Sequence, residues 1–541
     1  MDSRGQITRR TALRQAGVLA AAVAALEAAG PLAFVPQRAL AAATPSDIQF
    51  DISAFLSSPP QTFGSGVKFQ LPPVHTIFLT AALERTPAKA DQAEMKRVLA
   101  ALETAYPWGA ANLLTFVSYG LAYFKRLPGG LHGSLVSGHM PRLASDHSQY
   151  VLEEAVPGPT DVGPANPHVR KLRFNVDVKI EHNDLLFTLR SDNAAFLTDV
   201  LAWFGGSGKL RGKAVTSPAW TGLLSFTSSR HMFVQMGLPK SIASQRGLPF
   251  AGFIQHQSPM WMGFADQQVN GSGPAPICTF AGNSSAHLTT AVAGDYFDHG
   301  AIQHQSPMWM GFADQQVNGS GPAPICTFAG NSAAHLTTAV AGDYFDHGAI
   351  QHLSHLILDM LQFFAMKTPT SKPGADGTFV NRVQYAFHAP NLVPGNRDQF
   401  TDGGGPSLLP NQNHGPNYAQ RTAEGIGTNN GEQRMGHLSC LQRSSRAKDG
   451  TPIHLRMDGP GFDAMDVPGG GSQPKLQFTI FVPTSQFFKT LRVHQASLDL
   501  QKGFGVDPTA NGLERFITAT RRQNFLIPPR RHRAFPLIEL T

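Results

Sequence analysis

The chain has 541 residues, 42% of them hydrophobic and 15% charged, which is enough apolar material for a large buried core and more than one domain. Its formal net charge is +7, and residues 1–41 contribute +3 of this through five arginines against Asp2 and Glu27. The remaining +4 is small and scattered, which excludes a protein that binds nucleic acid through a basic surface.

The N-terminus is predicted to be a twin-arginine export segment, residues 1–43. Arg9–Arg10 precede an alanine-rich apolar run at 17–35, and the small-residue cleavage pattern Ala-Leu-Ala follows at 39–41. Glu27 is unusual inside such a run, and the alternative is an ordinary N-terminal helix or a lipid-free anchor. We expect export by the twin-arginine machinery to the periplasm or the exterior. No later stretch reaches the length of a membrane span, so no stable span is expected.

The next part, predicted as a domain over residues 44–215, alternates strands with helices. Asp91 is a candidate N-cap, and Gly206 is a candidate stop for the second helix. The pattern predicts strands at 74–83, 113–120, 171–182 and 185–191, and helices at 91–106 and 193–206. Such alternation, with hairpin-length links between strands, predicts an α+β fold built of ferredoxin-like units with antiparallel sheets and packed helices.

The rest of the chain, residues 216–541, is predicted to repeat this theme as a second domain. Leucines and other apolar residues at three- and four-residue spacing predict a helix at 352–366. A long glycine- and proline-rich excursion follows at 367–433. The remaining expected elements are strands at 247–254, 452–457 and 475–483 and a last helix at 511–522.

Residues 255–302 recur at 303–350 with a single change, Ser285 against Ala333. Solenoid proteins carry three or more diverged repeats, so this pair does not indicate a solenoid. Ile-Gln-His stands at the boundaries of both copies, which indicates a recent tandem duplication or an assembly error in the DNA. A sheet with one buried face has one place for a given strand, so we expect the fold to need one copy and part of 255–350 to be poorly ordered.

The sequence has no Walker loop, Cys-x-x-Cys zinc pair or nucleophile elbow, but several segments in chain order resemble the dye-decolourising peroxidase family. GFAD at 263–266, or at 311–314, resembles the start of the family's GxxDG signature. The segments that resemble its later parts are the strand and helix at 342–364, the histidine segment GHLSCLQRSSR at 436–446, the strand IHLRMDG at 453–459, and the closing elements at 476–495 and 512–530.

The resemblance implies two ferredoxin-like units in an arrangement like the dimeric α+β barrel, with haem b in the C-terminal unit. His437 would ligate the iron. Asp266 or Asp314 would move a proton between the oxygens of hydrogen peroxide. Arg456 would lie against the haem and stabilise the negative charge that develops as the O–O bond breaks.

The sequence departs from the family at the aspartate loop, because Gln267 or Gln315 stands where the family has its second glycine. Three functions therefore stay open. The first is an exported peroxidase that oxidises organic donors with hydrogen peroxide. The second is a haem-binding relative with little activity, and the third is a protein that keeps only the fold. The natural donor and the oligomeric state are open as well.

Overall fold

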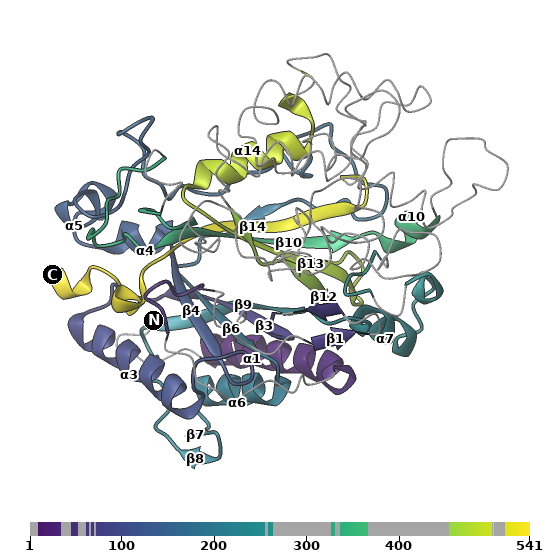
Figure 1. Cartoon of the computed structure of the whole chain (residues 1–541), viewed down its shortest axis with the longest axis horizontal. Helices are drawn as coiled ribbons and strands as arrows, with labels where there is room; N and C mark the ends of the chain where they lie inside the picture. Colours follow the sequence, from purple (N-terminus) through teal and green to yellow (C-terminus); the bar gives the residue numbers. More distant parts are fainter. Residues whose placement is uncertain are drawn as a thin grey trace, which may run out of the picture.

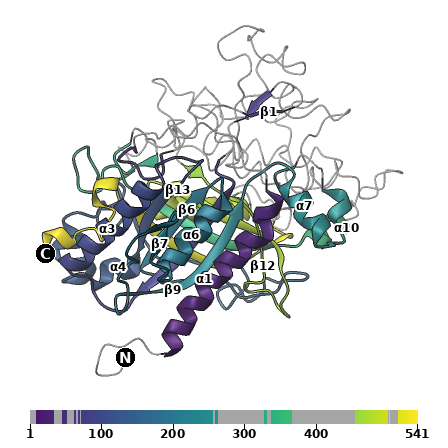
Figure 2. The ribbon, with the colours of Figure 1, turned by 90° about the horizontal axis from the view of Figure 1, so that it is seen from below.

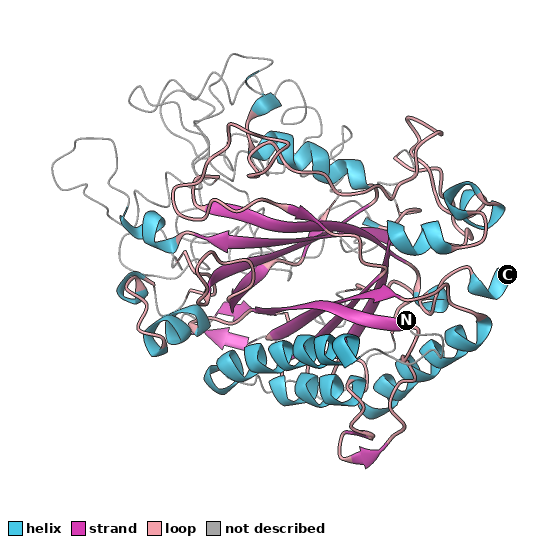
Figure 3. Ribbon diagram, turned by 180° about the vertical axis from the view of Figure 1, so that it is seen from behind, coloured by secondary structure: helices cyan, strands magenta, loops and turns pink. Residues whose placement is uncertain are grey.

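The computed structural model describes residues 9–33, 45–51, 61–63, 67–69, 72–254, 258–262, 326–330, 336–365, 454–499, 501 and 514–541. The strands form two layers that face each other, and helices cover the outer sides of both layers (Figures 1 and 3). Each layer is one unit of the same topology, as the strand order shows.

The first unit is an antiparallel sheet with the spatial order β4-β6-β3-β9. In chain order its elements are β3 (His75–Leu83), α3 (Lys89–Ala105), β4 (Leu114–Gly120), β6 (Leu185–Ser191), α6 (Ala194–Phe204) and β9 (Leu224–Phe233). This β-α-β-β-α-β succession, with strands in the order 2-3-1-4, is the ferredoxin-like pattern. The predicted domain boundary at 215 falls before β9, which pairs with β3. The division into domains itself stays a prediction.

The second unit repeats this order as β11-β13-β10-β14, with β12 also paired to β13. Its elements are β10 (Ala349–Leu358), α10 (Met360–Ala365), β11 (Leu455–Arg456), β12 (Gly459–Asp463), β13 (Gln473–Val482), α14 (Ser485–Gln495) and β14 (Ile517–Ile527). β14 pairs with β4 and joins the two units into one antiparallel sheet. The predicted α+β class with two ferredoxin-like units is confirmed.

At the other end of the sheet, β12 lies against β9, so the two layers enclose a barrel-like interior. β12 approaches β9 so closely that two of its positions require glycine. A Cβ on Gly459 would lie 2.8 Å from Val234 Cγ2, and a Cβ on Gly461 would lie 2.7 Å from the carbonyl oxygen of His231. The interior is filled by an apolar cluster that includes Phe78, Phe116, Leu353, Phe481 and Phe525.

Smaller elements complete the described chain. Helix α1 (Arg9–Ala29) lies beside α6 and β9 on the outer side of the first unit (Figure 2). The others are η1 (Gly30–Leu32), β1 (Gln61–Phe63), β2 (Val67–Phe69), α4 (Leu121–Arg126), η2 (Gly130–His132), α5 (Ser134–Ser137), β5 (Lys179–Ile180), β7 (Lys209–Leu210), β8 (Lys213–Ala214), α7 (Leu238–Gln245), η3 (Ala251–Phe253), η6 (Arg530–His532) and η7 (Ile538–Leu540).

Two predicted helices are wrong over most of their length. Residues 352–358 belong to strand β10, and only α10 at Met360–Ala365 is helical within the predicted 352–366. Residues 517–522 belong to strand β14. Both strands lie inside the sheet and are covered on both faces. In β10 the side chains of Gln351 and Leu353 point into the barrel, while His352 and Ser354 lie on the helix side. Because both faces are buried, apolar residues occur on each of them, and their spacing in the sequence imitates a helix.

Other corrections are smaller. The strand predicted at 171–182 is reduced to β5, and residues 247–254 form turns and η3 instead of a strand. Asp91 is not the N-cap of α3. The N-cap is Ala88, and Asp91 lies three residues inside the helix, where its carboxylate accepts a hydrogen bond from the Ala88 amide at 2.7 Å.

The described residues of the two repeat copies complement each other. The first copy contributes 258–262 and the second contributes 326–330 and 336–350, so each repeat position occurs at most once. Trp261 of the first copy and Phe345 of the second are both buried in apolar clusters. The expectation that part of 255–350 is poorly ordered concerns residues outside the described ones and stays a prediction.

Candidate functional site

Of the four site residues predicted from the sequence, Asp266, Asp314 and His437 lie outside the described residues. Arg456 is described, and it is the second residue of β11. The candidate site is therefore built outward from Arg456 and from the face of the second sheet on which it lies.

β11 is a short strand at one end of the second sheet, and its register determines the direction of Arg456. Leu455 pairs with Phe481 and belongs to the apolar cluster inside the barrel, as does Met457. Arg456 pairs with Ile480, which belongs to the cluster under the outer helices. Successive side chains of a strand point to opposite faces, so Arg456 lies on the helix side of the sheet. It is buried there, with 6% of its surface exposed.

Asp458 lies two residues beyond Arg456, between β11 and β12, and the charge of Arg456 acts on its carboxyl group. Sequence reasoning did not select it, although the Arg-x-Asp spacing on a predicted strand was the available signal. The side chain is buried, and among the residues that the structure describes its Oδ1 has no hydrogen-bond partner. Burial raises the pKa of this carboxyl to about 6, and the nearby Arg456 partly opposes the shift. The pair thus joins a permanent cation to an acid that can exchange a proton near neutral pH.

His352 of β10 lies on the same face, next to Ile480 in the sheet. Its Nδ1 contacts Asn524 Oδ1 at 2.6 Å, and its Nε2 contacts Ser354 Oγ at 2.6 Å. The ring stacks on Phe488 of α14 with centroids 3.3 Å apart. Burial lowers the pKa of His352 well below its ordinary value, so the ring is neutral. Since both nitrogens are engaged, His352 is a structural residue and not a free metal ligand.

A buried ion pair lies on the helix side of the second sheet, next to β14. Arg522 donates to both carboxylate oxygens of Asp161, from Nε at 2.6 Å and from Nη2 at 2.8 Å, and it also donates to Ser354 Oγ at 2.7 Å. Burial alone would raise the pKa of Asp161, but Arg522 overrides this effect and the pKa falls to about 2. These groups hold α14 and the preceding loops on the sheet.

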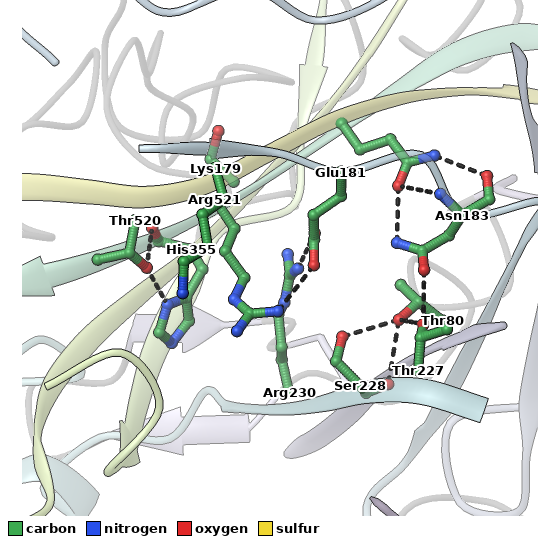
Figure 4. Close-up of polar contacts among 12 residues, drawn as sticks. Thr80, Lys179, Glu181, Asn183, Thr227, Ser228, Arg230, His355, Thr520 and Arg521 are labelled. Carbon is green, nitrogen blue, oxygen red and sulfur yellow. Dashed lines mark hydrogen bonds and ion pairs between the residues drawn. The ribbon is translucent and has the colours of Figure 1, made fainter. Parts of the chain in front are cut away.

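The polar residues inside the barrel form a second cluster, which connects the two units (Figure 4). Glu181 accepts hydrogen bonds from Arg230 of β9 and from Arg521 of β14, and Arg521 also pairs with Asp466. Burial would raise the pKa of Glu181, but the two arginines lower it. Because the carboxylate bridges strands of both units, this cluster stabilises the closed barrel.

One group of residues has the composition of a metal site. Ligand atoms of Asp47, Asp346 and His347 lie within 4.8 Å of one another. However, the guanidinium group of Arg531 pairs with both carboxylates. Arg531 already supplies the positive charge that a cation would bring, so this group is an ion-pair cluster that joins the C-terminal segment to residues 45–51 and to the turn before β10.

The sequence matches the model of a family of unknown function, DUF7405, over residues 73–155 and 278–529. No curated protein matches it. Three solved structures among those similar to the chain are a DypB variant from Rhodococcus jostii RHA1 in complex with heme, the encapsulated DyP-type peroxidase from Mycobacterium smegmatis, and a putative DyP-type peroxidase protein from Shewanella oneidensis.

All three are 12% identical to the chain, with TM-scores of 0.39, 0.35 and 0.36 in the same order. The alignments cover 86%, 87% and 89% of this chain and 96%, 96% and 98% of the respective structures.

Proposed function

The chain belongs to the DUF7405 family of unknown function, and we propose that it is an exported haem peroxidase that oxidises organic donors with hydrogen peroxide. The observation that carries this proposal is the pair of Arg456 and Asp458, which are both buried and interact electrostatically next to β11. The order of the motifs in the sequence places the predicted haem ligand, His437, just before this strand. The two ferredoxin-like units are the fold that the resemblance implies.

The residues present fit a haem site in their chemistry. Haem b, ligated by His437, would supply the oxidising chemistry. Arg456 stays charged at every relevant pH and would stabilise negative charge on the leaving oxygen of hydrogen peroxide. A buried carboxyl with a pKa of about 6, such as that of Asp458, can hold a proton beside Arg456 and release it. Asp266 or Asp314 would move the peroxide proton from one oxygen to the other.

The atoms and electrons balance in a simple way. Hydrogen peroxide takes up two electrons and two protons, its O–O bond breaks, and two water molecules leave. The organic donor is oxidised by the loss of these two electrons. Export by the twin-arginine machinery would place this reaction in the periplasm or outside the cell.

A haem-binding protein with little turnover is the second candidate. Gln267 and Gln315, which follow the two copies of the aspartate, favour it. Glutamine disfavours backbone conformations that glycine adopts freely, so the aspartate would be displaced from the position that proton transfer needs.

The first experiment is a titration of the purified full-length protein with haemin, followed by its absorption spectrum. We expect a Soret band that is lost or strongly shifted in His437→Ala and retained in His168→Ala, an exposed histidine of the first half of the chain. Without a Soret band at any haemin concentration, the peroxidase and the haem carrier are both excluded. If haem binds, turnover of a phenolic dye with hydrogen peroxide distinguishes the two.

A further inference from the structure

The predicted export segment forms a helix that is docked on the folded protein. One face of α1 is buried, with Ala22, Leu26 and Ala29 at 1%, 1% and 3% exposure. These residues follow the i, i+4, i+7 spacing of a single helix face. Glu27, which is anomalous within an export segment, lies on the exposed side. The apolar run therefore has the pattern of a helix packed on a protein surface.

Two hydrogen bonds join α1 to β9. Gln15 Nε2 donates to the carbonyl oxygen of Leu224 at 2.9 Å, and Ser229 Oγ donates to the carbonyl oxygen of Val18 at 3.1 Å. The fit is also close at α6, since a Cβ on Gly30 would lie 2.9 Å from Ala194 Cβ. Both the apolar face and these polar contacts hold α1 on the outer side of the first sheet.

Two histidines lie on this side of the sheet, on the neighbouring strands β3 and β9. His75 Nδ1 and His231 Nε2 are 3.1 Å apart, and the rings stack with centroids 5.3 Å apart. Both side chains are buried, at 1% and 4% exposure. The backbone of Ala25 in α1 interacts with the ring of His231. The histidine pair is thus in direct contact with the docked helix.

The pair can carry only one proton between its two facing nitrogens. While they hydrogen-bond, one nitrogen donates and the other accepts. A second proton would place two N–H groups face to face in a buried site. Burial lowers the pKa of His231 to about 4, although the Asp463 carboxylate on β12 and the Ala25 backbone favour the charged ring. The pKa of His75 is also lowered well below its ordinary value, mainly by burial and to a smaller extent by the charge of a protonated His231. Glu27, the acidic residue of α1, is exposed to solvent.

We propose that α1 is an acid-releasable helix, which the His75–His231 pair keeps docked near neutral pH and which leaves the sheet in mild acid to bind an anionic lipid surface. The lipid surface follows from the composition of the segment. Residues Gln15–Leu32 have a mean hydropathy of 1.4 over 18 residues, long and apolar enough to cross a membrane. Arg9, Arg10 and Arg14 precede this stretch and would attract anionic headgroups.

Linkage gives the expected size of the response. Release of α1 would expose His231 to water and raise its pKa from about 4 in the docked state toward its ordinary value of 6.5. Protonation therefore favours the released state between these values. Lowering the pH from 7.5 to 5.0 should raise the ratio of released to docked protein by up to about 30-fold through His231 alone, the limit that corresponds to complete recovery of the ordinary pKa.

Hydrogen exchange of the full-length protein at pH 7.5 and 5.0, corrected for the intrinsic exchange rates, tests the release. We expect peptides of α1 to lose protection at pH 5.0, by up to about 30-fold, while peptides of β10 keep theirs, which separates release from global unfolding. In His231→Gln, which cannot be charged in this range, the acid response of α1 should disappear. The exposed His168→Gln should keep it. Equal protection of α1 at both pH values in the unmodified protein would overturn the proposal.

A second pair of variants tests the docking without changing a histidine. Leu26→Asp on the buried face should release α1 at both pH values, whereas Ala24→Asp on the exposed face should leave it docked at pH 7.5. Sedimentation with phosphatidylcholine–phosphatidylglycerol vesicles then tests the lipid partner. Binding at pH 5.0 but not at 7.5, and binding of Leu26→Asp at both, is expected. Release without vesicle binding would refute the lipid surface, and binding of Leu26→Asp and Ala24→Asp alike at pH 7.5 would refute the docked state.

Discussion

The indole nitrogen of Trp261 donates a hydrogen bond to the carbonyl oxygen of Gly461, 2.9 Å away. Trp261 belongs to the first repeat copy and is 1% exposed, while Gly461 lies on β12, where the barrel closes against β9. The second copy supplies the chain that enters β10. The described fold thus uses the beginning of one copy and the end of the other, as a single composite unit.

This use of the copies predicts that two identical repeat positions respond differently to mutation. Trp261→Ala removes a buried indole and its hydrogen bond, so we expect the free energy of unfolding to fall by about 3–5 kcal/mol. Trp309 is the same repeat position and lies outside the described residues. Trp309→Ala should change the stability by less than about 1 kcal/mol. Urea denaturation of both variants checks this, and equal losses would contradict a composite unit.

Removing residues 263–310 tests the same conclusion through the backbone. The deletion takes out 48 residues, joins Met262 to Gly311 and leaves every described residue in place. The deletion shortens the connection between Met262 and Cys326 from 63 to 15 residues, which lowers the entropic cost of closing it, so the free energy of unfolding should rise by about 1 kcal/mol. A single cooperative transition with a slightly higher midpoint is expected in urea. A broad transition, or insoluble protein, would show that the surplus copy supports the fold.

Asp458 should make the protein less stable as the pH rises. Its pKa is about 6 in the folded state against 3.8 ordinarily, so between these values the folded state binds more protons than the unfolded state. The free energy of unfolding therefore falls as the pH rises through this window, by about 3 kcal/mol in total. Asp458→Asn should be more stable than the unmodified protein at pH 7 by up to this amount and equal to it at pH 4. Thermal unfolding at both pH values measures the difference, and a constant offset would contradict the assignment.

The ion pair of Arg522 and Asp161 should respond strongly to the loss of one partner. Arg522→Met leaves the buried Asp161 carboxylate with only Arg492, which is 3.6 Å away, and should cost about 3–5 kcal/mol of stability. The double variant Arg522→Met with Asp161→Leu should recover most of this loss. Since the pKa of Asp161 is lowered to about 2, the stabilisation is present above pH 3.8 and is lost as the pH falls toward 2. A double-mutant cycle by urea denaturation at pH 7 measures the coupling.

Arg456 should matter for turnover more than for cofactor binding. If the proposed peroxidase function holds, Arg456→Ala should keep the Soret band and lower turnover with hydrogen peroxide by about 10²–10³-fold, because the cation acts on developing charge. The turnover of Arg456→Lys should lie between that of the unmodified protein and that of Arg456→Ala, because lysine keeps the charge but lacks the planar guanidinium group. A loss of the Soret band in Arg456→Ala would instead assign the arginine to binding. Unchanged turnover would remove it from the site.

Local patterns in the sequence were sufficient to predict a helix or strand where a single pattern was clear. β6 and α6 agree with prediction because an apolar strand and a helix capped by Asn193 each have a clear local pattern. β10 and β14 do not. In β14, Arg521 and Arg522 are both largely buried, one pairing with Asp466 in the interior and the other with Asp161 under α14. Their partners are far away in the chain, so no local pattern could indicate that two adjacent arginines belong to a covered strand.

For the candidate site, the sequence pointed to Arg456 through the motif around it, whereas Asp458 was identified by its burial and by its Oδ1, which has no hydrogen-bond partner among the described residues. By itself the sequence determined the α+β class, the presence of a repeat and the order of the motifs, since these depend on composition, periodicity and identity along the chain. Only the tertiary structure decided which strands are covered on both faces, which parts of the two copies enter the sheet, and that the predicted export segment packs on β9. Those outcomes depend on contacts between residues that are far apart in the chain, because each group is buried by neighbours from other parts of the sequence.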